Sequence, residues 1–481
     1  MDWNKLISNC RLGQEHRHPE RHDDRTEFKR DYDRLIFSAP FRRLQNKTQV
    51  FPLPGSVFVH NRLTHSLEVA SVGMSLGNDV STALRSRKIG GTLGSVPYYG
   101  KEGGGTLGSV SYYGKEGGGT LGSVPYYDSP LLSELGQIVA SACLAHDLGN
   151  PPFGHSGEKA IQTFFTEGKG LALKEKVTPA FWDDITHFEG NANAFRLLTH
   201  QFKGRRPGGF VMTYSTLASI VKYPYSSSLA GKKGKFGFFN SEAPVYERIA
   251  EEMGILRLSE PGQPLRYARH PLVYLVEAAD DICYEIMDLE DAHKLKILSF
   301  DETADLMLGF FDDDTRSRIL QRIEDEQLTD PNEKIQYLRA CVIGKLENEC
   351  VETFLRHEEE ILSGQMEGSL IDHIGELPRA AYKTCTRISK ARIYKSQPVL
   401  DVELSGYRIM ATLMELMVDA IEHPERYYSQ QLIGRVSSQY DIESDDLETR
   451  LMAVIDYISG MTDVYALDVY QKICGISLPI V

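Results

Sequence analysis

Apolar residues recur at steps of three and four along most of this chain, and this spacing restricts its fold more than any other feature. Such steps place side chains on one face of an α-helix, whereas the alternation typical of half-buried strands is scarce. The clearest stripes are Val69, Val72, Leu76 and Val80; Leu135, Ile138, Val139, Ala142 and Cys143; Val276, Ala279, Cys283 and Ile286; and Ile409, Leu413, Leu416 and Ala420. The sequence therefore predicts a mainly α-helical protein.

The chain is long enough to form more than one compact region. Its 481 residues, of which 41% are hydrophobic, can bury a substantial core. We expect residues 1–300 to carry the chemistry and residues 301–481, a second set of helices with charged faces, to complete the site. Breaks rich in glycine, serine and lysine at 203–209 and 226–237 are typical of loops.

Residues 91–127 hold a tandem repeat of about fourteen residues, GTLGSVPYYGKEGG, GTLGSVSYYGKEGG and GTLGSVPYY. Its glycine density cannot sustain a helix, and so few copies are too short for a solenoid. We interpret it as a surface insertion between two helices, either a flexible loop or a small β-ribbon. Because loops tolerate added length at a small entropic cost, a duplication without a role is the favoured interpretation.

Hydropathy and cysteine usage restrict the class of protein. No apolar run approaches the roughly 20 residues that span a bilayer, and the N-terminal stretch MDWNKLISNCRLGQEHRHPERHDD is polar from its start. We therefore expect a cytoplasmic protein without a membrane helix or a signal peptide. The seven cysteines are scattered and lack CxxC pairing, which argues against a disulfide framework or a thiolate zinc site.

The net charge of −14 disfavours indiscriminate binding to nucleic acid, but it conceals a local asymmetry. No acidic residue occurs between Asp33 and Glu68. The basic residues in that stretch are Arg34, Arg42, Arg43, Lys47 and Arg62. The stretch is either a solvated basic face or a functional positive field that leads into the first candidate metal ligand.

One apolar stripe ends in residues of a different kind. The stripe of Leu135, Ile138 and Ala142 continues at the next four-residue step with His146, and Asp147 follows at once. The glycine and prolines of GNPP then end the helix. Taken alone, these two residues could be a buried histidine and the carboxylate that satisfies it.

Two further residues favour a metal site. His65 opens the helix that carries the Val69 stripe, and Asp280 lies beside Ala279 on an apolar stretch. An unpaired carboxylate there would cost several kcal/mol unless a cation neutralised it. Two imidazoles and two carboxylates suit Mg²⁺, Mn²⁺ or another first-row divalent metal, and they leave coordination positions open for water and substrate. The sequence therefore predicts a catalytic metal site.

The order of these motifs resembles a known family. H…HD…D is similar to the HD superfamily of phosphohydrolases. RRLQNKTQVFPL, RLTHSLEV, HDLGNPPFGHSGE, HFEGNANAFRLL, EAADDICY, LEDA and DYISGMTDVYALD resemble the deoxyguanosine triphosphate triphosphohydrolase (dGTPase) family more narrowly. The dipeptide HD is a weak signal, whereas HDxGNPPFGHxGE is highly specific. The spacing from His65 to His146 is longer than that family suggests, and the repeat at 91–127 fills the excess.

The resemblance implies an HD-domain helical fold with additional C-terminal helices and the glycine-rich insertion. It also implies metal-dependent hydrolysis of dGTP, with other dNTPs as candidates, to deoxynucleoside and inorganic triphosphate. The implied metal ligands are His65, His146, Asp147 and Asp280, in agreement with the residues chosen above.

Asp281 competes with Asp280 for the fourth ligand position. We prefer Asp280 because Tyr284 and Asp288 follow it at four-residue steps on one helix face, where they could contact the substrate.

The resemblance also assigns residues to the reaction. His155 is the implied acid/base residue, and Glu158 is its partner one helical turn away, although both could simply be polar residues that begin a helix. Other candidate substrate contacts are the phosphate-binding residues Arg62, Lys222 and Tyr223; Gln49 for the 3′-hydroxyl; Asn191; and Arg408 for the base.

Two other functions remain open at the sequence level. An HD phosphodiesterase acting on another nucleotide or a nucleic acid end would use the same ligands. A nucleotide-sensing or single-strand-binding module would use the basic stretch from 34 to 62, with a steep dependence on salt. Relatives in the dGTPase family form ring-like oligomers, often hexamers, and some bind single-stranded DNA, so a homo-oligomer with a dNTP substrate is the expected assembly.

Deleting residues 91–118, which comprise two whole repeats, is expected to leave turnover within a few-fold of the full chain. The reason is that this insertion contributes none of the candidate site residues. Steady-state hydrolysis rates of the two proteins check this. Loss of soluble protein or of turnover would show that the repeat packs on the core or builds a subunit contact.

Overall fold

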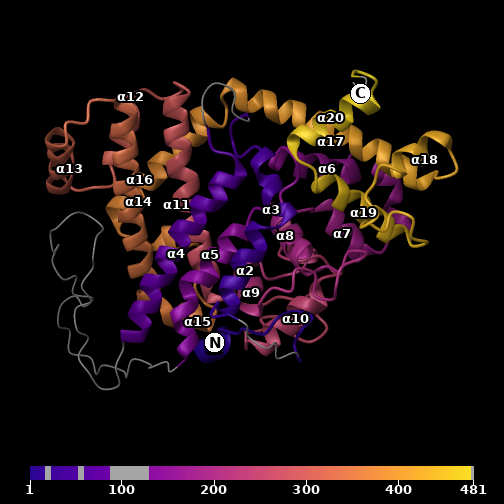
Figure 1. Cartoon of the computed structure of the whole chain (residues 1–481), viewed down its shortest axis with the longest axis horizontal. Helices are drawn as coiled ribbons and strands as arrows, with labels where there is room; N and C mark the ends of the chain where they lie inside the picture. The colour runs from indigo at the N-terminus through magenta and orange to yellow at the C-terminus, as the bar shows by residue number, and fades with distance from the viewer. Residues whose placement is uncertain (17–22, 53–58, 87–128, 478–481) are drawn as a thin grey trace.

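The computed structural model describes residues 1–16, 23–52, 59–86 and 129–477, and within these ranges the regular structure is helical (Figure 1). The prediction of a mainly α-helical fold is confirmed. The β-pairing among the described residues consists of isolated bridges such as Arg11 with Thr213. None of the described helices combines the length and the apolar character needed to cross a membrane. The repeat at 91–127 lies outside the described residues.

The α-helices are α1 (Trp3–Leu6), α2 (Glu27–Ile36), α3 (Ala39–Arg43), α4 (Arg62–Ser86), α5 (Leu135–Ala145), α6 (His155–Thr166), α7 (Pro179–Thr186), α8 (Gly190–Thr199), α9 (Tyr214–Ile220), α10 (Ala243–Glu252), α11 (Pro271–Lys294), α12 (Phe300–Leu308), α13 (Asp313–Asp325), α14 (Pro331–Arg356), α15 (Glu358–Ser363), α16 (Glu376–Ile388), α17 (Gln397–Glu422), α18 (Tyr427–Ile433), α19 (Leu447–Ser459) and α20 (Asp463–Ile473).

Helices α4, α5 and α11 pack together and form the centre of the larger hydrophobic core. Glycines allow the backbones of α4 and α5 to approach closely, because a Cβ atom on Gly77 of α4 would lie 2.7 Å from the Cα atom of Gly136 on α5. Helices α2 and α9 cover α5, and α14 covers α11 and α4. The apolar stripes of the sequence thus face one another across this bundle.

A second hydrophobic core contains residues of α6, α7, α17 and α19, in which α17 packs against α6 and α19. Figure 1 shows these helices together at one end of the molecule. Both cores contain residues from before and after residue 300. The expected regions 1–300 and 301–481 therefore interleave in space.

Buried charges also join the two regions. Arg196 of α8 donates to Asp456 of α19 through Nε at 2.9 Å and through Nη2 at 2.8 Å, and its Nη1 donates to Glu242 at 2.6 Å. Only 6% of the Arg196 side chain and 3% of each carboxylate side chain are exposed to solvent. Each charge is therefore stabilised mainly by the others.

The loop between α5 and α6 is held by several distant parts of the chain. The backbone N–H groups of Phe153 and Thr48 donate to the two oxygens of Asp463, at 2.9 and 2.7 Å. Lys47 donates to the carbonyl oxygens of Asn150 and Ser459, at 2.5 and 3.1 Å. Residues near both ends of the chain thus fix the segment that follows His146.

Replacing Arg196 by alanine is expected to lower the free energy of unfolding by about 3–5 kcal/mol, because Asp456 and Glu242 would remain buried without their cation. The matched control is Arg426→Ala, which removes an exposed arginine paired with exposed Asp419 and is expected to cost less than about 1 kcal/mol. Urea denaturation of the three proteins measures both effects. Equal losses in the two variants would contradict the role given to the buried cluster.

Candidate metal and phosphate site

Most of the site residues predicted from the sequence line one cavity of about 290 Å³. It is formed by the loop after α5 and by residues on or beside α4, α6, α8, α9 and α11. The predicted residues that line it are Gln49, Arg62, His146, Asp147, His155, Glu158, Asn191, Lys222, Tyr223, Asp280 and Tyr284. Residues far apart in the sequence therefore converge on a single cleft.

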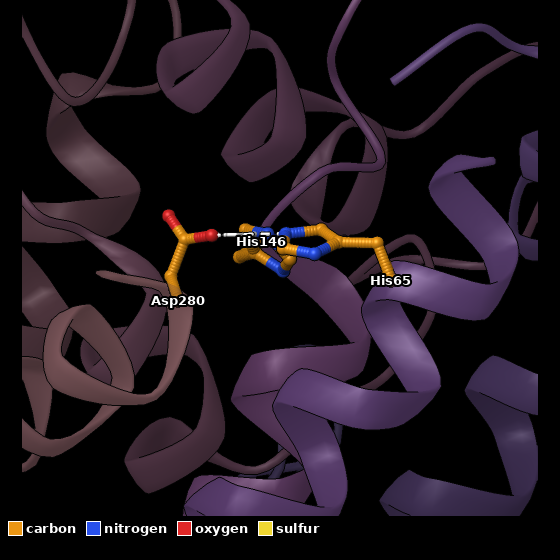
Figure 2. Close-up of side chains that lie close together, drawn as sticks. All are labelled: His65, His146 and Asp280. Carbon is orange, nitrogen blue, oxygen red and sulfur yellow. Dashed lines mark hydrogen bonds and ion pairs between the residues drawn. The ribbon is translucent and has the colours of Figure 1, made fainter. Parts of the chain in front are cut away.

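Three side chains from three helical segments bring ligand atoms together at this cleft; His146 and Asp280 line it, whereas His65 contacts Asp280 without being a lining residue. His65 lies on α4, His146 caps the C-terminus of α5, and Asp280 lies on α11. Their ligand atoms all lie within 4.8 Å of one another. Oδ1 of Asp280 is 3.0 Å from Nε2 of His65 and 3.4 Å from Nε2 of His146, and Figure 2 shows this carboxylate directed toward the two rings.

The orientation of His146 is the one that a metal ligand requires. Its Nδ1 lies 2.6 Å from the carbonyl oxygen of Cys143, which can only accept, so Nδ1 carries a proton. Its Nε2 is buried and faces Oδ1 of Asp280 at 3.4 Å. Although burial lowers it, the pKa of His146 is raised to about 9 because Asp147 and Asp280 lie close by. This donor set of nitrogen and oxygen atoms fits a divalent cation.

Asp147 lies beside this group but has other partners. Its Oδ2 accepts a hydrogen bond from Nη1 of Arg62 at 2.8 Å, and its Oδ1 accepts from Asn150. The same Oδ1 is 3.7 Å from Nε2 of His146. The structure thus places Asp147 next to the three candidate ligands, and its service as a fourth ligand stays a prediction.

The structure distinguishes Asp280 from Asp281. Asp280 contacts the two histidines, whereas Asp281 lines a second cavity of about 720 Å³ on another side of α11. Burial raises the pKa of Asp281 to about 8, although Lys222 lowers it in part. The preference for Asp280 in the candidate ligand set therefore agrees with the geometry.

Three cationic side chains line the cleft, and each is paired with a carboxylate. Arg62 pairs with Asp147, Nζ of Lys222 lies 3.0 Å from Glu277, and Nζ of Lys235 lies 2.7 Å from Glu189. Lys235, Glu189 and Glu277 are cleft residues that the sequence analysis did not single out. Glu189 stands within the motif HFEGNANAFRLL, whereas Lys235 lies in a segment whose composition indicates only a loop.

His155 and Glu158 both line the cleft from the first turn of α6, but they do not form the expected pair. Among the described residues, Oε1 of Glu158 accepts from the backbone N–H of Gly190 at 2.8 Å instead. The free N–H groups at the start of α8 attract this carboxylate more directly than a ring on its own helix. Burial and the nearby cations Lys235 and Arg62 lower the pKa of His155, which favours its neutral form.

The remaining predicted contacts fall into two groups. Oε1 of Gln49 is buried and has no hydrogen-bond partner among the residues that the structure describes, and the Tyr284 ring lies 6.3 Å from the His65 ring. Asp288 and Arg408 do not line the cleft: Asp288 is buried and accepts from the Tyr394 hydroxyl at 2.8 Å, and Arg408 is exposed on α17. The roles of these two residues in substrate binding stay predictions.

The basic stretch from 34 to 62 is not a solvated basic face. Arg34 donates to the carbonyl oxygens of Phe210 and Val211, and Arg43 donates to that of Gly460. Lys47 and Arg62 are buried. Most of this positive charge therefore serves the fold and the cleft, whereas Arg42 is exposed. Binding of single-stranded DNA along this stretch stays a prediction.

Comparisons with known proteins agree with the geometry. A family described as phosphohydrolase-associated domain matches residues 378–472. Proteins named deoxyguanosinetriphosphate triphosphohydrolase-like from Pseudomonas aeruginosa and Synechocystis sp. are each 35% identical to this chain, covering 100% and 99% of it and 100% of their own length. A deoxyguanosinetriphosphate triphosphohydrolase of Yersinia enterocolitica is 28% identical over 93% of each chain.

The chain belongs to the deoxyguanosinetriphosphate triphosphohydrolase-like family of HD phosphohydrolases. It is therefore a phosphohydrolase that acts on nucleoside triphosphates. Members of the HD phosphohydrolase family generally depend on divalent metals, and the group of His65, His146 and Asp280 is a candidate for that metal.

Replacing Asp280 or His146 by alanine is expected to remove bound metal and turnover while leaving the helical content largely unchanged, because each contributes an atom to the candidate ligand group. Asp281→Ala is the matched control for metal content, since it removes the neighbouring carboxylate that faces the other cavity. Elemental analysis, circular dichroism and hydrolysis rates measure the three outcomes. Full metal content in Asp280→Ala or His146→Ala would exclude that residue from the ligand set.

Proposed function

We propose that this protein hydrolyses deoxynucleoside triphosphates, with dGTP as the first candidate, to a deoxynucleoside and inorganic triphosphate. The observation that carries this proposal is the juxtaposition in one cleft of the His65, His146 and Asp280 group with the cations Arg62, Lys222 and Lys235. The names of the family members support dGTP as substrate.

In this proposal the three cations bind the phosphates. Their carboxylate partners hold them in the cleft, so their direction is fixed before the substrate arrives. Although burial opposes it, Glu277 raises the pKa of Lys222, which keeps that ammonium charged. A divalent cation held by His65, His146 and Asp280, with Asp147 beside them, would supply Lewis-acid polarisation of a phosphoryl oxygen.

His155 handles the proton. Its imidazole lines the cleft and its lowered pKa keeps it neutral at pH 7, so it can accept a proton from the attacking water. The protonated ring can then donate to the 5′ oxygen as the bond to the α-phosphorus breaks. Protonation at that oxygen is what a deoxynucleoside leaving group requires.

The nucleoside is proposed to extend toward Tyr284, which lines both the metal cleft and the second cavity. The amide oxygen of Gln49 lacks a donor, and a sugar 3′-hydroxyl would supply one. The second cavity, with Tyr382 and Tyr394, offers aromatic surfaces for a base. Close packing at the 2′ carbon would exclude ribonucleotides.

An HD phosphodiesterase is the second candidate function. It would use the same ligand group but would not need Lys222 and Lys235 in the cleft, and these cations favour a polyphosphate substrate. A cytoplasmic location rests on the hydropathy of the sequence, a hexameric or other homo-oligomer rests on the family resemblance, and binding of single-stranded DNA rests on that resemblance and on the basic stretch. All three stay predictions.

Turnover of dGTP in ¹⁸O-labelled water tests which bond breaks. Attack at the α-phosphorus with the 5′ oxygen as leaving group is expected to place the label in inorganic triphosphate and none in the deoxynucleoside. Mass spectrometry of the two products, separated by ion-exchange chromatography, measures this. Release of deoxynucleoside monophosphate and pyrophosphate, or label in the nucleoside, would refute the triphosphohydrolase proposal.

A parallel assay of each dNTP and NTP with several divalent metals defines the substrate and the metal. Hydrolysis of dNTPs without hydrolysis of NTPs is the expected pattern.

A further inference from the structure

One buried carboxylate outside the cleft holds both ends of the segment 227–240, here called the Lys235 loop. Oδ1 of Asp184, on α7, accepts from the Ser227 hydroxyl at 2.6 Å and from Nδ2 of Asn240 at 2.9 Å. Its Oδ2 accepts from the backbone N–H of Asn240 at 2.9 Å. Asn240 also donates to the Ser227 hydroxyl at 3.3 Å, so the two ends of the loop meet at this carboxylate.

The middle of the Lys235 loop enters the cleft. Nζ of Lys235 lies 2.7 Å from Oε1 of Glu189, beside His155 and Tyr223 in the lining. Gly237 passes so close to the carbonyl oxygen of Tyr223 that a Cβ atom on Gly237 would collide with it. The backbone N–H of Gly237 donates to the carbonyl oxygen of Tyr225 at 3.1 Å. The position of the loop therefore determines where Lys235 sits and what supports Tyr223 from behind.

Besides Asp184, the first half of the Lys235 loop is held by Ala230, which is buried in the second hydrophobic core, and by the packing of residues 227–229 on α7. Gly231 and Gly234 have φ of +55° and +65°, and nothing lies within 4 Å of where their Cβ atoms would be. Phe236 and Phe239 are buried in the second hydrophobic core and anchor the second half. Asp184 therefore adds a side-chain closure to these apolar anchors and to the backbone bridge between Ser226 and Phe238.

The chemistry of Asp184 matches this task. The Asp184 side chain is buried, and its donors are neutral groups. Burial raises the pKa of Asp184 to about 7, although the hydrogen bonds from Ser227 and Asn240 lower it in part. A carboxylate can satisfy all three donors, whereas an amide in its place would turn an NH₂ group toward at least one of them. Burying a carboxylate costs free energy, and the hydrogen bonds that hold the two ends of the loop offset part of that cost.

We propose that Asp184 is a positioning residue for Lys235: by closing the Lys235 loop it places the ammonium in the cleft and raises the affinity of the site for a polyphosphate. This rests on the proposed function for the identity of the anion. Asp184 does not line the cleft and acts only through the loop.

The first experiment tests the loop without using activity. Asp184→Asn is expected to increase the rate of tryptic cleavage after Lys232 and Lys233, which are exposed in this loop, by about tenfold or more. Asp183→Asn, a half-exposed neighbour on the same helix, is the matched control and is expected to cleave like the wild type. Mass spectrometry of the fragments identifies the sites. An unchanged rate in Asp184→Asn would overturn the closure role.

The second experiment tests whether Asp184 acts through Lys235. Isothermal titration with inorganic triphosphate is expected to show about a tenfold or greater loss of affinity for Asp184→Asn and a similar loss for Lys235→Met, since each would remove one charge-assisted contact. The double variant is expected to bind no more weakly than Lys235→Met alone. A further loss of similar size in the double variant would show that Asp184 acts independently, which would overturn the proposal.

The controls separate the possible failures. If the wild type does not bind inorganic triphosphate and does not hydrolyse dNTPs, the proposed function fails, while the tryptic pattern still decides whether Asp184 closes the loop. If Asp184→Asn does not fold, Ser227→Ala removes one donor from the same carboxylate and is expected to give a smaller increase in cleavage at the same lysines. Wild-type cleavage in Ser227→Ala would then count against the proposal.

Discussion

The carboxylate of Asp463 is the contact on which the candidate site depends most. It accepts the backbone N–H groups of Thr48 and Phe153, so a residue near the C-terminal end joins the segment before α4 to the loop after α5. That loop begins with His146 and Asp147, and its path fixes both side chains. Packing of α20 therefore helps to hold the segments that flank the ligand group on α4 and α5. This contact supports the prediction that residues 301–481 complete the site, which stays a prediction.

Pairing of buried charge is the second constraint. Arg62, Lys222 and Lys235 would each be costly to bury alone, and the carboxylates of Asp147, Glu277 and Glu189 stabilise them. The same pairing limits how strongly the cleft can bind an anion, because a phosphate must compete with a carboxylate that is already in place. The benefit is preorganisation, since the cationic side chains are already ordered in the cleft when the substrate enters.

The helices and the candidate metal ligands follow from local pattern, whereas most other lining residues are predicted from the resemblance to the dGTPase family. Stripes at three- and four-residue steps identify α4, α5 and α11, and histidines or aspartates on those stripes identify His65, His146 and Asp280. Partners across the fold are not encoded in spacing. Glu158 stands three residues from His155, as a pairing would require, yet it accepts from Gly190 of α8. The sequence likewise could not show whether the basic stretch before His65 is solvated, because Arg34 and Arg43 bind carbonyl oxygens that lie far away in the sequence.

Helix α11 fixes the spacing between the ligand group and the side chains proposed to lie near the nucleoside. Four residues of helix advance by about 6 Å, so Asp280, Tyr284 and Asp288 form a straight row on one face. Asp280 belongs to the ligand group, Tyr284 separates the two cavities, and Asp288 accepts from Tyr394 behind it. In the proposed function, this rigid helix would set the distance from the reacting phosphorus to the nucleoside, and contacts on loops such as that of Lys235 would hold the phosphates in line with it. Errors in loop position should then weaken phosphate binding before they disturb the register of the nucleoside.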